Sequence, residues 1–252
     1  MKKTFSSIVI AVTLANGPFL AGRYYQSDVE AAVSPISVAL PQIETPVAKE
    51  STLFTAWTDG YGRDVSRQNR FNRDIERAMQ EWQELDPLIL KSLLAQESGF
   101  RTDKRNRYGY TGVAQIGYRE ALEAGLVVEN GCDQRYTPHY AIPAAARIMR
   151  RKALHLHQEG FSKYGMPDKE EYWKFIAAAY NAGEGTIVKA MKKAYGNRKP
   201  DKVRFDDLIR TASGNPWDSP LMHAMPKRWR RVSKYKEIKE YAINVVARAR
   251  QG

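Results

Sequence analysis

A carboxylate at the end of an apolar helix is the feature of this sequence that most directly suggests chemistry. Asp86 predicts the helix start as an N-cap, Pro87 fits the first helical position, and Gly99 predicts the end just past the last turn. Glu97 lies in that last turn. Three leucines share its helix face at the i, i+3, i+4, i+7 spacing: Leu90, Leu93 and Leu94.

The position of Glu97 predicts an unusual carboxyl group. An apolar face packed into the core keeps the side chain from water, and a helix C-terminus carries partial negative charge. Both effects raise the pKa of Glu97. A carboxyl group that stays protonated near neutral pH can act as a general acid. The alternative is a last-turn glutamate that turns to solvent and has no catalytic role.

Length and charge narrow the class of protein. The 252 residues, 43% of them hydrophobic, suffice for one globular domain with extra segments. A net charge of +12 favours a polyanionic neighbour such as nucleic acid, an anionic membrane face or an anionic cell wall. The basic residues gather at 101–107, 147–152 and 227–239. The last run interleaves Trp229 and Tyr235 with cations, which suits nucleic acid binding or the solvated face of a terminal helix.

Several common kinds of site lack their sequence pattern. The single cysteine, Cys132, excludes an internal disulfide. His155 and His157 are two residues apart, which points them to different sides of a helix. Neither a glycine-rich phosphate loop nor a nucleophile-elbow motif occurs. We therefore expect no metal and no cofactor.

Residues 1–22 have the pattern of an export signal. Lys2 and Lys3 precede an apolar run at 5–15, and Ala21-Gly22 offers a cleavage point. The run is short for a dependable transmembrane helix, and the cysteine of a lipoprotein does not follow it. We expect an exported, periplasmic or envelope-associated protein. An uncleaved N-terminal membrane anchor and a buried N-terminal helix or strand are the alternatives.

Residues 23–70 combine a linker with an ambiguous segment. The stretch 24–49 is rich in Ala, Val, Ser and Pro without a helical or strand period, as is typical of a linker. In the segment 51–70, Phe54 and Trp57 are candidates to dock onto the following domain.

From Phe71 onward the hydrophobic spacing predicts one mainly α domain over 71–252. The expected helices cover 71–82, 87–98, 119–124, a segment opened by Pro143, 170–180, 186–194, 205–212 and 234–250. The segment 213–220 is expected to be a loop. No internal repeat is visible, and no alternating strand run exceeds a few residues.

Four short motifs follow one another in this domain, each at or near a helix end. They are Glu97-Ser98, GVAQI at 112–116, AAYNAG at 178–183 and EIKEY at 237–241. Here the sequence resembles the soluble lytic transglycosylase catalytic domain family, whose motifs are Glu-Ser, Gly-Leu-Met-Gln, Ala-Tyr-Asn and Glu-Thr-x-x-Tyr. The resemblance implies a lysozyme-like fold, of the goose-type lysozyme and transglycosylase kind, in a single catalytic domain.

Three stretches depart from the family pattern. Val113-Ala114 replaces Leu-Met and stays apolar, whereas Ile238 replaces a Thr and so loses a hydroxyl and one local hydrogen bond. Tyr108-Gly109-Tyr110 replaces a lead-in of small residues. None of these changes touches the acid.

Cleavage of a glycosidic bond raises the question of a second carboxylate. Ordinary glycosidases use one as nucleophile or base, and Asp103, Glu120 and Asp133 are the candidates. All three lie in charged or loop contexts that give no reason to place them opposite Glu97. Without one, the N-acetyl group of the sugar itself can attack the anomeric carbon, as in substrate-assisted enzymes. The resemblance then implies N-acetylmuramic acid as substrate and closure of a 1,6-anhydro ring, with Glu97 acting first as acid and then as base.

The resemblance also implies a substrate-binding set around Glu97: Ser98, Gly112, Val113, Gln115, Tyr180, Asn181 and Tyr241. Ser98 would hydrogen-bond near the acid or the sugar, Gln115 would offer an amide to sugar groups, and the Tyr241 hydroxyl would face the carboxyl. The alternatives are an ordinary helix-terminal serine, a loop-stabilising amide and a core tyrosine.

These observations favour a peptidoglycan lytic transglycosylase that cleaves the β-1,4 bond between N-acetylmuramic acid and N-acetylglucosamine. A hydrolytic muramidase on the same fold is the alternative enzyme, and a non-catalytic cell-wall or nucleic-acid binding module is the alternative class. The expected partners are peptidoglycan strands and the anionic wall surface, with no nucleic acid. Wall turnover and a secretion, conjugation or phage machine are all compatible with this sequence.

Overall fold

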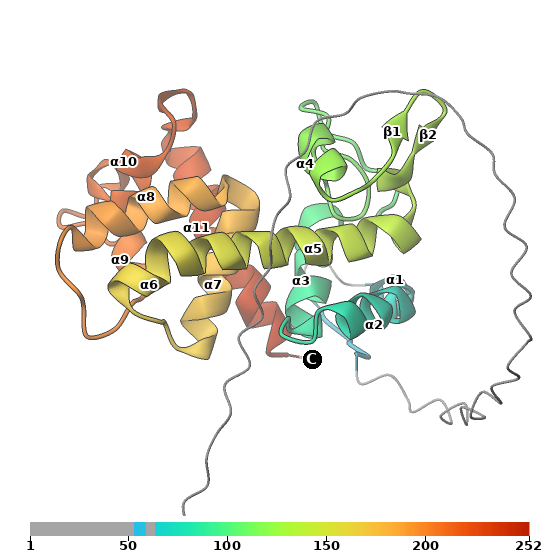
Figure 1. Cartoon of the computed structure of the whole chain (residues 1–252), viewed down its shortest axis with the longest axis horizontal. Helices are drawn as coiled ribbons and strands as arrows, with labels where there is room; N and C mark the ends of the chain where they lie inside the picture. The colour runs from blue at the N-terminus through green and yellow to red at the C-terminus, as the bar shows by residue number, and fades with distance from the viewer. Residues whose placement is uncertain (1–52, 59–63, 252) are drawn as a thin grey trace, which may run out of the picture. The chain divides into compact units, whose positions relative to one another are not determined.

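The computed structural model describes residues 53–58 and 64–251, and this part of the chain is mainly helical (Figure 1). The described residues belong to one compact unit, 48–252. The predicted export signal at 1–22 and the predicted linker stretch at 24–49 lie outside the described residues. No helix among those described has the length and apolar character needed to cross a membrane.

The described residues form helices, short helical turns and one pair of strands. The helices are α1 (Val65–Asn69), α2 (Asn72–Glu81), α3 (Pro87–Ser98), α4 (Tyr118–Glu123), α5 (Pro138–Leu156), α6 (Ser162–Tyr164), α7 (Lys169–Ala182), α8 (Glu184–Tyr195), α9 (Phe205–Ile209), α10 (Pro220–Ala224) and α11 (Val232–Ala249). Two strands, β1 (Val128–Glu129) and β2 (Cys132–Asp133), pair antiparallel. Short helical turns are η1 (Gln134–Tyr136), η2 (His157–Phe161), η3 (Pro216–Asp218) and η4 (Lys227–Trp229). The prediction of a mainly α domain is confirmed.

Helix α3 begins and ends where its sequence predicts. The Asp86 side chain accepts a hydrogen bond from the backbone N–H of Leu88 at 3.0 Å, which caps the helix. Gly99 ends it with a left-handed φ of 61°. The leucine face is completely buried, with 0% exposure at each position: Leu90, Leu93 and Leu94. This burial fixes the rotation of the helix and thereby the direction of Glu97.

Helix α11 packs against both α3 and α7, so the C-terminal segment lies beside the helix that carries Glu97 (Figure 1). Three consecutive alanines of α7, at 177–179, are 0% exposed. Ile238 of α11 is also fully buried. An isoleucine at this position therefore contributes apolar packing where a threonine would bring a hydroxyl that needs a partner.

Helix α5 begins at Pro138, five residues before the predicted start at Pro143. The proline at 143 lies inside the helix, where it cannot donate a hydrogen bond to the carbonyl of His139, four residues earlier. The Arg77 side chain of α2 donates to that carbonyl at 3.2 Å. This contact from a neighbouring helix satisfies the acceptor that the proline leaves free.

The segment before Phe71 packs onto the domain. Leu53 and Trp57 are 3% exposed and belong to the hydrophobic core, whereas Phe54, the other docking candidate, is 62% exposed. The Gln68 side chain of α1 holds this segment, because it accepts from the Trp57 backbone N–H at 2.9 Å and donates to its carbonyl at 2.8 Å. The packed structure thus includes residues on the N-terminal side of 71.

Two short helices near residue 210 differ from the prediction. Helix α9 ends at Ile209 because Arg210 takes an extended conformation, so the predicted end at 212 is wrong. Helix α10 then starts at Pro220, with the Ser219 hydroxyl accepting from the Met222 backbone N–H at 3.2 Å. The predicted loop at 213–220 also contains the short turn η3.

Candidate active site

Glu97 lies in the last turn of α3, partly buried, with its carboxyl group facing α11. The Tyr241 hydroxyl donates a hydrogen bond to its Oε1 atom at 2.7 Å. Burial raises the pKa of Glu97 from 4.5 to about 7, and the Tyr241 hydrogen bond partly opposes this rise. Glu97 is therefore a carboxyl group that exchanges a proton near neutral pH, which is the property required of a general acid.

Tyr241 lies on the buried face of α11 and is 4% exposed. Burial and the nearby Glu97 carboxylate raise the pKa of its hydroxyl well above 10, so the phenol stays protonated and remains a donor. The two residues are 144 positions apart in the chain. The expectation that the Tyr241 hydroxyl faces the acid agrees with this geometry.

Two lysines that sequence reasoning did not single out also act on Glu97. The Lys104 amino group donates to the backbone carbonyl of Glu97, and burial lowers the pKa of Lys104. The charges of Lys104 and Lys234 lower the pKa of Glu97. Lys104 lies in the basic segment 101–107 and Lys234 in the run 227–239, so composition alone gave no signal that separates these two from their neighbours.

The loop at 112–116 is joined to α3 by Ser98, the residue that follows Glu97. The Ser98 hydroxyl donates to the backbone carbonyl of Val113 at 2.7 Å and approaches that of Leu94 at 3.3 Å. Ser98 is 3% exposed and Val113 1%. Both residues therefore fix the loop against the helix, and neither side chain is placed to contact a sugar directly.

Gly112 allows this loop to pass close to another backbone segment. Its φ is +78°, and a Cβ atom there would lie 1.8 Å from the carbonyl oxygen of Arg135. The close approach at Gly112 is thus made to the protein's own backbone, whereas the resemblance implied a role in substrate binding.

Gln115 turns inward. Its Nε2 atom donates to the carbonyls of Lys104 at 2.9 Å and Gly112 at 3.0 Å, and the residue is 6% exposed. Its backbone adopts a left-handed φ of 47°. This geometry favours the loop-stabilising amide, which was the alternative to sugar binding.

The last turn of α7 carries two further residues of the predicted set, Tyr180 and Asn181. The Tyr180 hydroxyl donates to the Ala114 carbonyl at 3.0 Å, and burial raises its pKa well above 10. Asn181 donates to Glu237 at 3.2 Å and accepts from Lys234 at 3.1 Å. Asn181 is partly buried, and its side-chain amide lies between Glu237 and Lys234 of α11.

The three candidate second carboxylates have other partners or positions. Asp133 forms a close ion pair with Arg135, at 2.7 Å, and Asp103 is exposed on its loop. Glu120 is 2.9 Å from the Lys152 amino group. Its negative charge raises the pKa of Glu97, which places it within electrostatic range of the acid.

Lys152 organises this side of the site. Its side chain is 4% exposed and its amino group is 2.9 Å from both Glu120 of α4 and Glu184 of α8. One buried cation thereby joins α4, α5 and α8, and it holds Glu120 in an ion pair. Within the described residues no group of His, Cys, Asp and Glu is arranged to hold a metal ion.

Comparison with known proteins places this arrangement in a family. The transglycosylase SLT domain family matches residues 74–203, just over half of the 252 residues, including the first three motifs. No curated protein matches the chain. Among solved structures it is similar to an inactive mutant of lytic transglycosylase Slt from Pseudomonas aeruginosa, with 15% identity and a TM-score of 0.45. That match covers 74% of this chain and 24% of the other.

The fourth motif, at 237–241, lies beyond the matched residues, but its Tyr241 contacts the acid of the first motif. The family match confirms the resemblance drawn from the four motifs, and with it the mainly α, lysozyme-like fold. The chain belongs to the transglycosylase SLT domain family.

Proposed function

We propose that this protein is a peptidoglycan lytic transglycosylase and that Glu97 performs both proton transfers of the reaction. The observation that carries the proposal is the Glu97 carboxyl group itself, with a pKa of about 7 and one hydrogen bond from Tyr241. A group with this pKa is populated in both protonation states near neutral pH, so it can give a proton in one step and take one in the next.

In the first step the Glu97 carboxyl donates its proton to the glycosidic oxygen. The bond from that oxygen to the anomeric carbon of N-acetylmuramic acid breaks, and the N-acetylglucosamine end leaves as an alcohol. The carbonyl oxygen of the substrate's own N-acetyl group bonds to the anomeric carbon. The Tyr241 hydroxyl stabilises the carboxylate that remains, because it donates to Oε1.

In the second step the Glu97 carboxylate removes the proton from the sugar's C6 hydroxyl. The C6 oxygen attacks the anomeric carbon and displaces the N-acetyl oxygen, which closes the 1,6-anhydro ring. Glu97 is protonated again and ready for the next bond. The pairing of Glu120 with Lys152 supports this route over hydrolysis, since the carboxylate in electrostatic range of Glu97 is already held by a buried cation.

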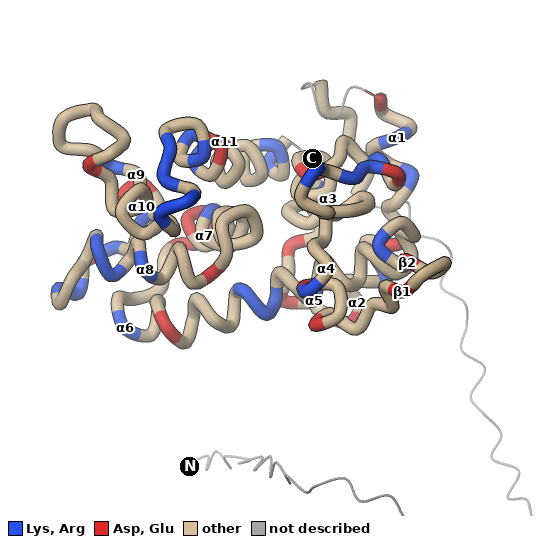
Figure 2. Tube along the Cα trace, turned by 90° about the horizontal axis from the view of Figure 1, so that it is seen from above, with Lys and Arg blue, Asp and Glu red and all other residues tan. Residues whose placement is uncertain are grey.

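The charge of the protein supports an envelope setting. The net charge of +12 suits an anionic wall surface, and the sequence of residues 1–22 suits export to the periplasm or cell envelope. Lys and Arg recur along α8 and along the segment that leads into α11 (Figure 2).

The products of digestion test the proposal. Purified cell walls are incubated with the wild-type protein and with Glu97→Gln, and the soluble fragments are analysed by mass spectrometry. We expect anhydro ends from the wild type and a loss of rate of about 10²–10⁴-fold in Glu97→Gln, because the amide has no transferable proton. If the wild type produces reducing ends, the protein is a hydrolytic muramidase and the proposal is wrong. If folded Glu97→Gln lyses walls as fast as the wild type, Glu97 has no role in the mechanism.

A further inference from the structure

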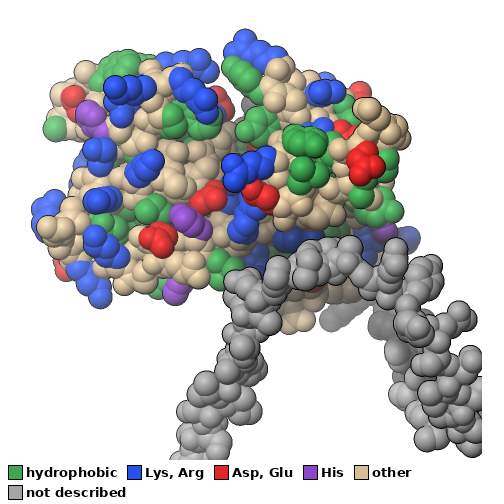
Figure 3. All heavy atoms as spheres, turned by 45° about the horizontal axis from the view of Figure 1, so that its top comes forward, with side chains coloured by type: hydrophobic (Ala, Val, Ile, Leu, Met, Phe, Trp, Pro, Cys, Tyr) green, Lys and Arg blue, Asp and Glu red, His purple; other side chains and the backbone are tan. Residues whose placement is uncertain are grey.

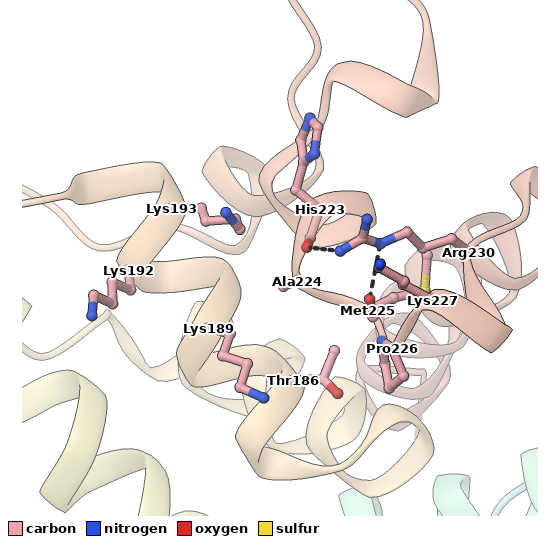
Figure 4. A pocket seen from close by; sticks show the side chains of 10 residues that line it. All are labelled: Thr186, Lys189, Lys192, Lys193, His223, Ala224, Met225, Pro226, Lys227 and Arg230. Atoms are coloured by element: carbon pink, nitrogen blue, oxygen red, sulfur yellow. Dashed lines mark hydrogen bonds between the residues drawn. The ribbon is translucent and has the colours of Figure 1, made fainter.

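A basic cavity lies between α8 and the segment that runs from α10 to the start of α11 (Figure 4). Its volume is about 650 Å³. Five cationic side chains line it, together with His223: Lys189, Lys192, Lys193, Lys227 and Arg230. No Asp or Glu is among its lining residues. On the face drawn in Figure 3, Lys and Arg side chains outnumber Asp and Glu over the left-hand part.

The five cations of this cavity differ from Lys152 and Arg135. Those two each contact a carboxylate, at 2.9 Å and 2.7 Å. Within the described part of the chain, none of the five cavity cations forms an ion pair. The negative end of the α8 dipole stabilises Lys192 and Lys193 in the last turn. The helix dipole does not stabilise the charge of Lys189, which precedes the last turn, or the charges of Lys227 and Arg230 on the opposite wall.

Arg230 is held in place before any ligand arrives. Its Nε atom donates to the Met225 carbonyl at 3.0 Å and its Nη2 atom to the His223 carbonyl at 2.8 Å (Figure 4). Its Nη1 atom has no hydrogen-bond partner among the described residues. A guanidinium fixed by two backbone carbonyls loses little side-chain freedom when it binds an anion, which favours binding.

A chain of contacts links the cavity wall to a group that acts on Glu97. Lys227 begins the turn η4, and the ring of Trp229, at the end of that turn, has the Lys234 amino group 5.9 Å from its centroid. Lys234 in turn donates to Asn181, just before α8. The turn η4 of the cavity wall thus contacts Lys234 of α11, whose charge lowers the pKa of Glu97. Glu97 is not among the residues that line the cavity.

We propose that this cavity binds the carboxylate groups of the peptides that branch from the glycan strands of peptidoglycan. The inference rests on the proposed function. The glycan carries its peptide carboxylates away from the glycosidic bond, on branches, so cations in a cavity that does not include Glu97 match their position better than cations at the acid. Unpaired lysines and a preorganised arginine supply the charge and the hydrogen bonds for several carboxylates at once.

Two sets of matched variants test this inference. The cavity variant carries Lys189→Gln, Lys192→Gln and Lys193→Gln. The control carries three exposed lysines elsewhere changed in the same way: Lys163→Gln, Lys169→Gln and Lys236→Gln. Both lose three positive charges, so the net charge of the whole protein is equal. Each full-length protein is assayed on soluble glycan strands with intact peptides and on strands from which an amidase has removed the peptides.

We expect the cavity variant to raise KM for peptide-bearing strands about tenfold at low ionic strength, with kcat unchanged. KM for peptide-free strands should stay within about twofold of wild type. The control variant should show neither effect. An equal rise on both substrates, or an equal rise in the control, would overturn the inference and assign the effect to net charge.

Calorimetric titration with a soluble tripeptide that carries three carboxylates separates this inference from the proposed function. Binding by the wild type that is lost in the cavity variant supports the inference, whether or not strands are cleaved. Cleavage without any peptide binding overturns the inference and leaves the proposed function standing. Polyphosphate and a single-stranded oligonucleotide are titrated in the same way. If either binds more tightly than the tripeptide and the cavity variant loses that binding, the inference is overturned and the cavity is assigned to a phosphate polymer.

Discussion

Replacing Glu97 with Gln is expected to stabilise the folded protein in alkaline solution while it removes the acid. In the wild type, folding transfers a carboxyl group into a site where its charged form is disfavoured by burial. The amide of Gln has nearly the same shape and no charge, so it fits the site at every pH. The difference in unfolding free energy between the two proteins should therefore depend on pH.

The sign and size follow from the two pKa values. Below pH 4.5 Glu97 is protonated in the folded and the unfolded chain, so pH has no effect on its contribution. Between pH 4.5 and about 7 only the folded chain keeps the proton, and the wild type loses stability as pH rises. A difference of one unit between the folded and unfolded pKa corresponds to about 1.4 kcal/mol of unfolding free energy. The difference from 4.5 to about 7 therefore makes Glu97→Gln more stable than the wild type by about 3 kcal/mol above pH 8.

Urea unfolding of both proteins at a series of pH values from about 4 to 9 measures this difference. Glu240→Gln is the control, because Glu240 is exposed on the same helix as Tyr241 and its loss removes a carboxylate without opening the site. We expect a difference that is constant below pH 4.5, grows to about pH 7 and then stays level. Parallel stability curves for wild type and Glu97→Gln would refute the conclusion that Glu97 holds its proton near neutral pH.

Tyr241→Phe removes the hydroxyl that donates to Glu97 at 2.7 Å. The pH–rate profile should then show reduced turnover, with the limb that Glu97 controls moved to higher pH. An unchanged profile would make Tyr241 a core residue only. Gly112→Ala places a Cβ atom 1.8 Å from a backbone carbonyl at a φ of +78°, so thermal unfolding should show a loss of at least about 2 kcal/mol. Lys152→Met leaves two carboxylates without their cation and should cost about 3 kcal/mol at pH 7. Burial raises the pKa of Glu184, but pairing with Lys152 outweighs it and keeps this pKa below its usual value. The stability that Lys152→Met loses relative to the wild type should therefore shrink below about pH 4, as measured by urea unfolding.

Local sequence was enough to determine the helix that carries the acid. The cap at Asp86, the proline after it and the glycine at 99 act within a few residues, and the leucine spacing sets which face is buried. These signals predicted where Glu97 stands and that its pKa is raised. The order of the four motifs predicted the family that the family model matches, because residue types and their spacing can be read from the sequence alone.

Only the tertiary structure decided what surrounds the acid. The contact between Tyr241 and Glu97 spans 144 residues, and its donor and acceptor are set by how α11 packs on α3. Packing likewise turns Ser98 and Gln115 toward backbone carbonyls, so their polar groups stabilise the loop although their types alone also suited sugar binding. The pairing of Lys152 with carboxylates of two other helices has no local pattern. Charges meet there because three helices converge, and convergence is a property of the fold.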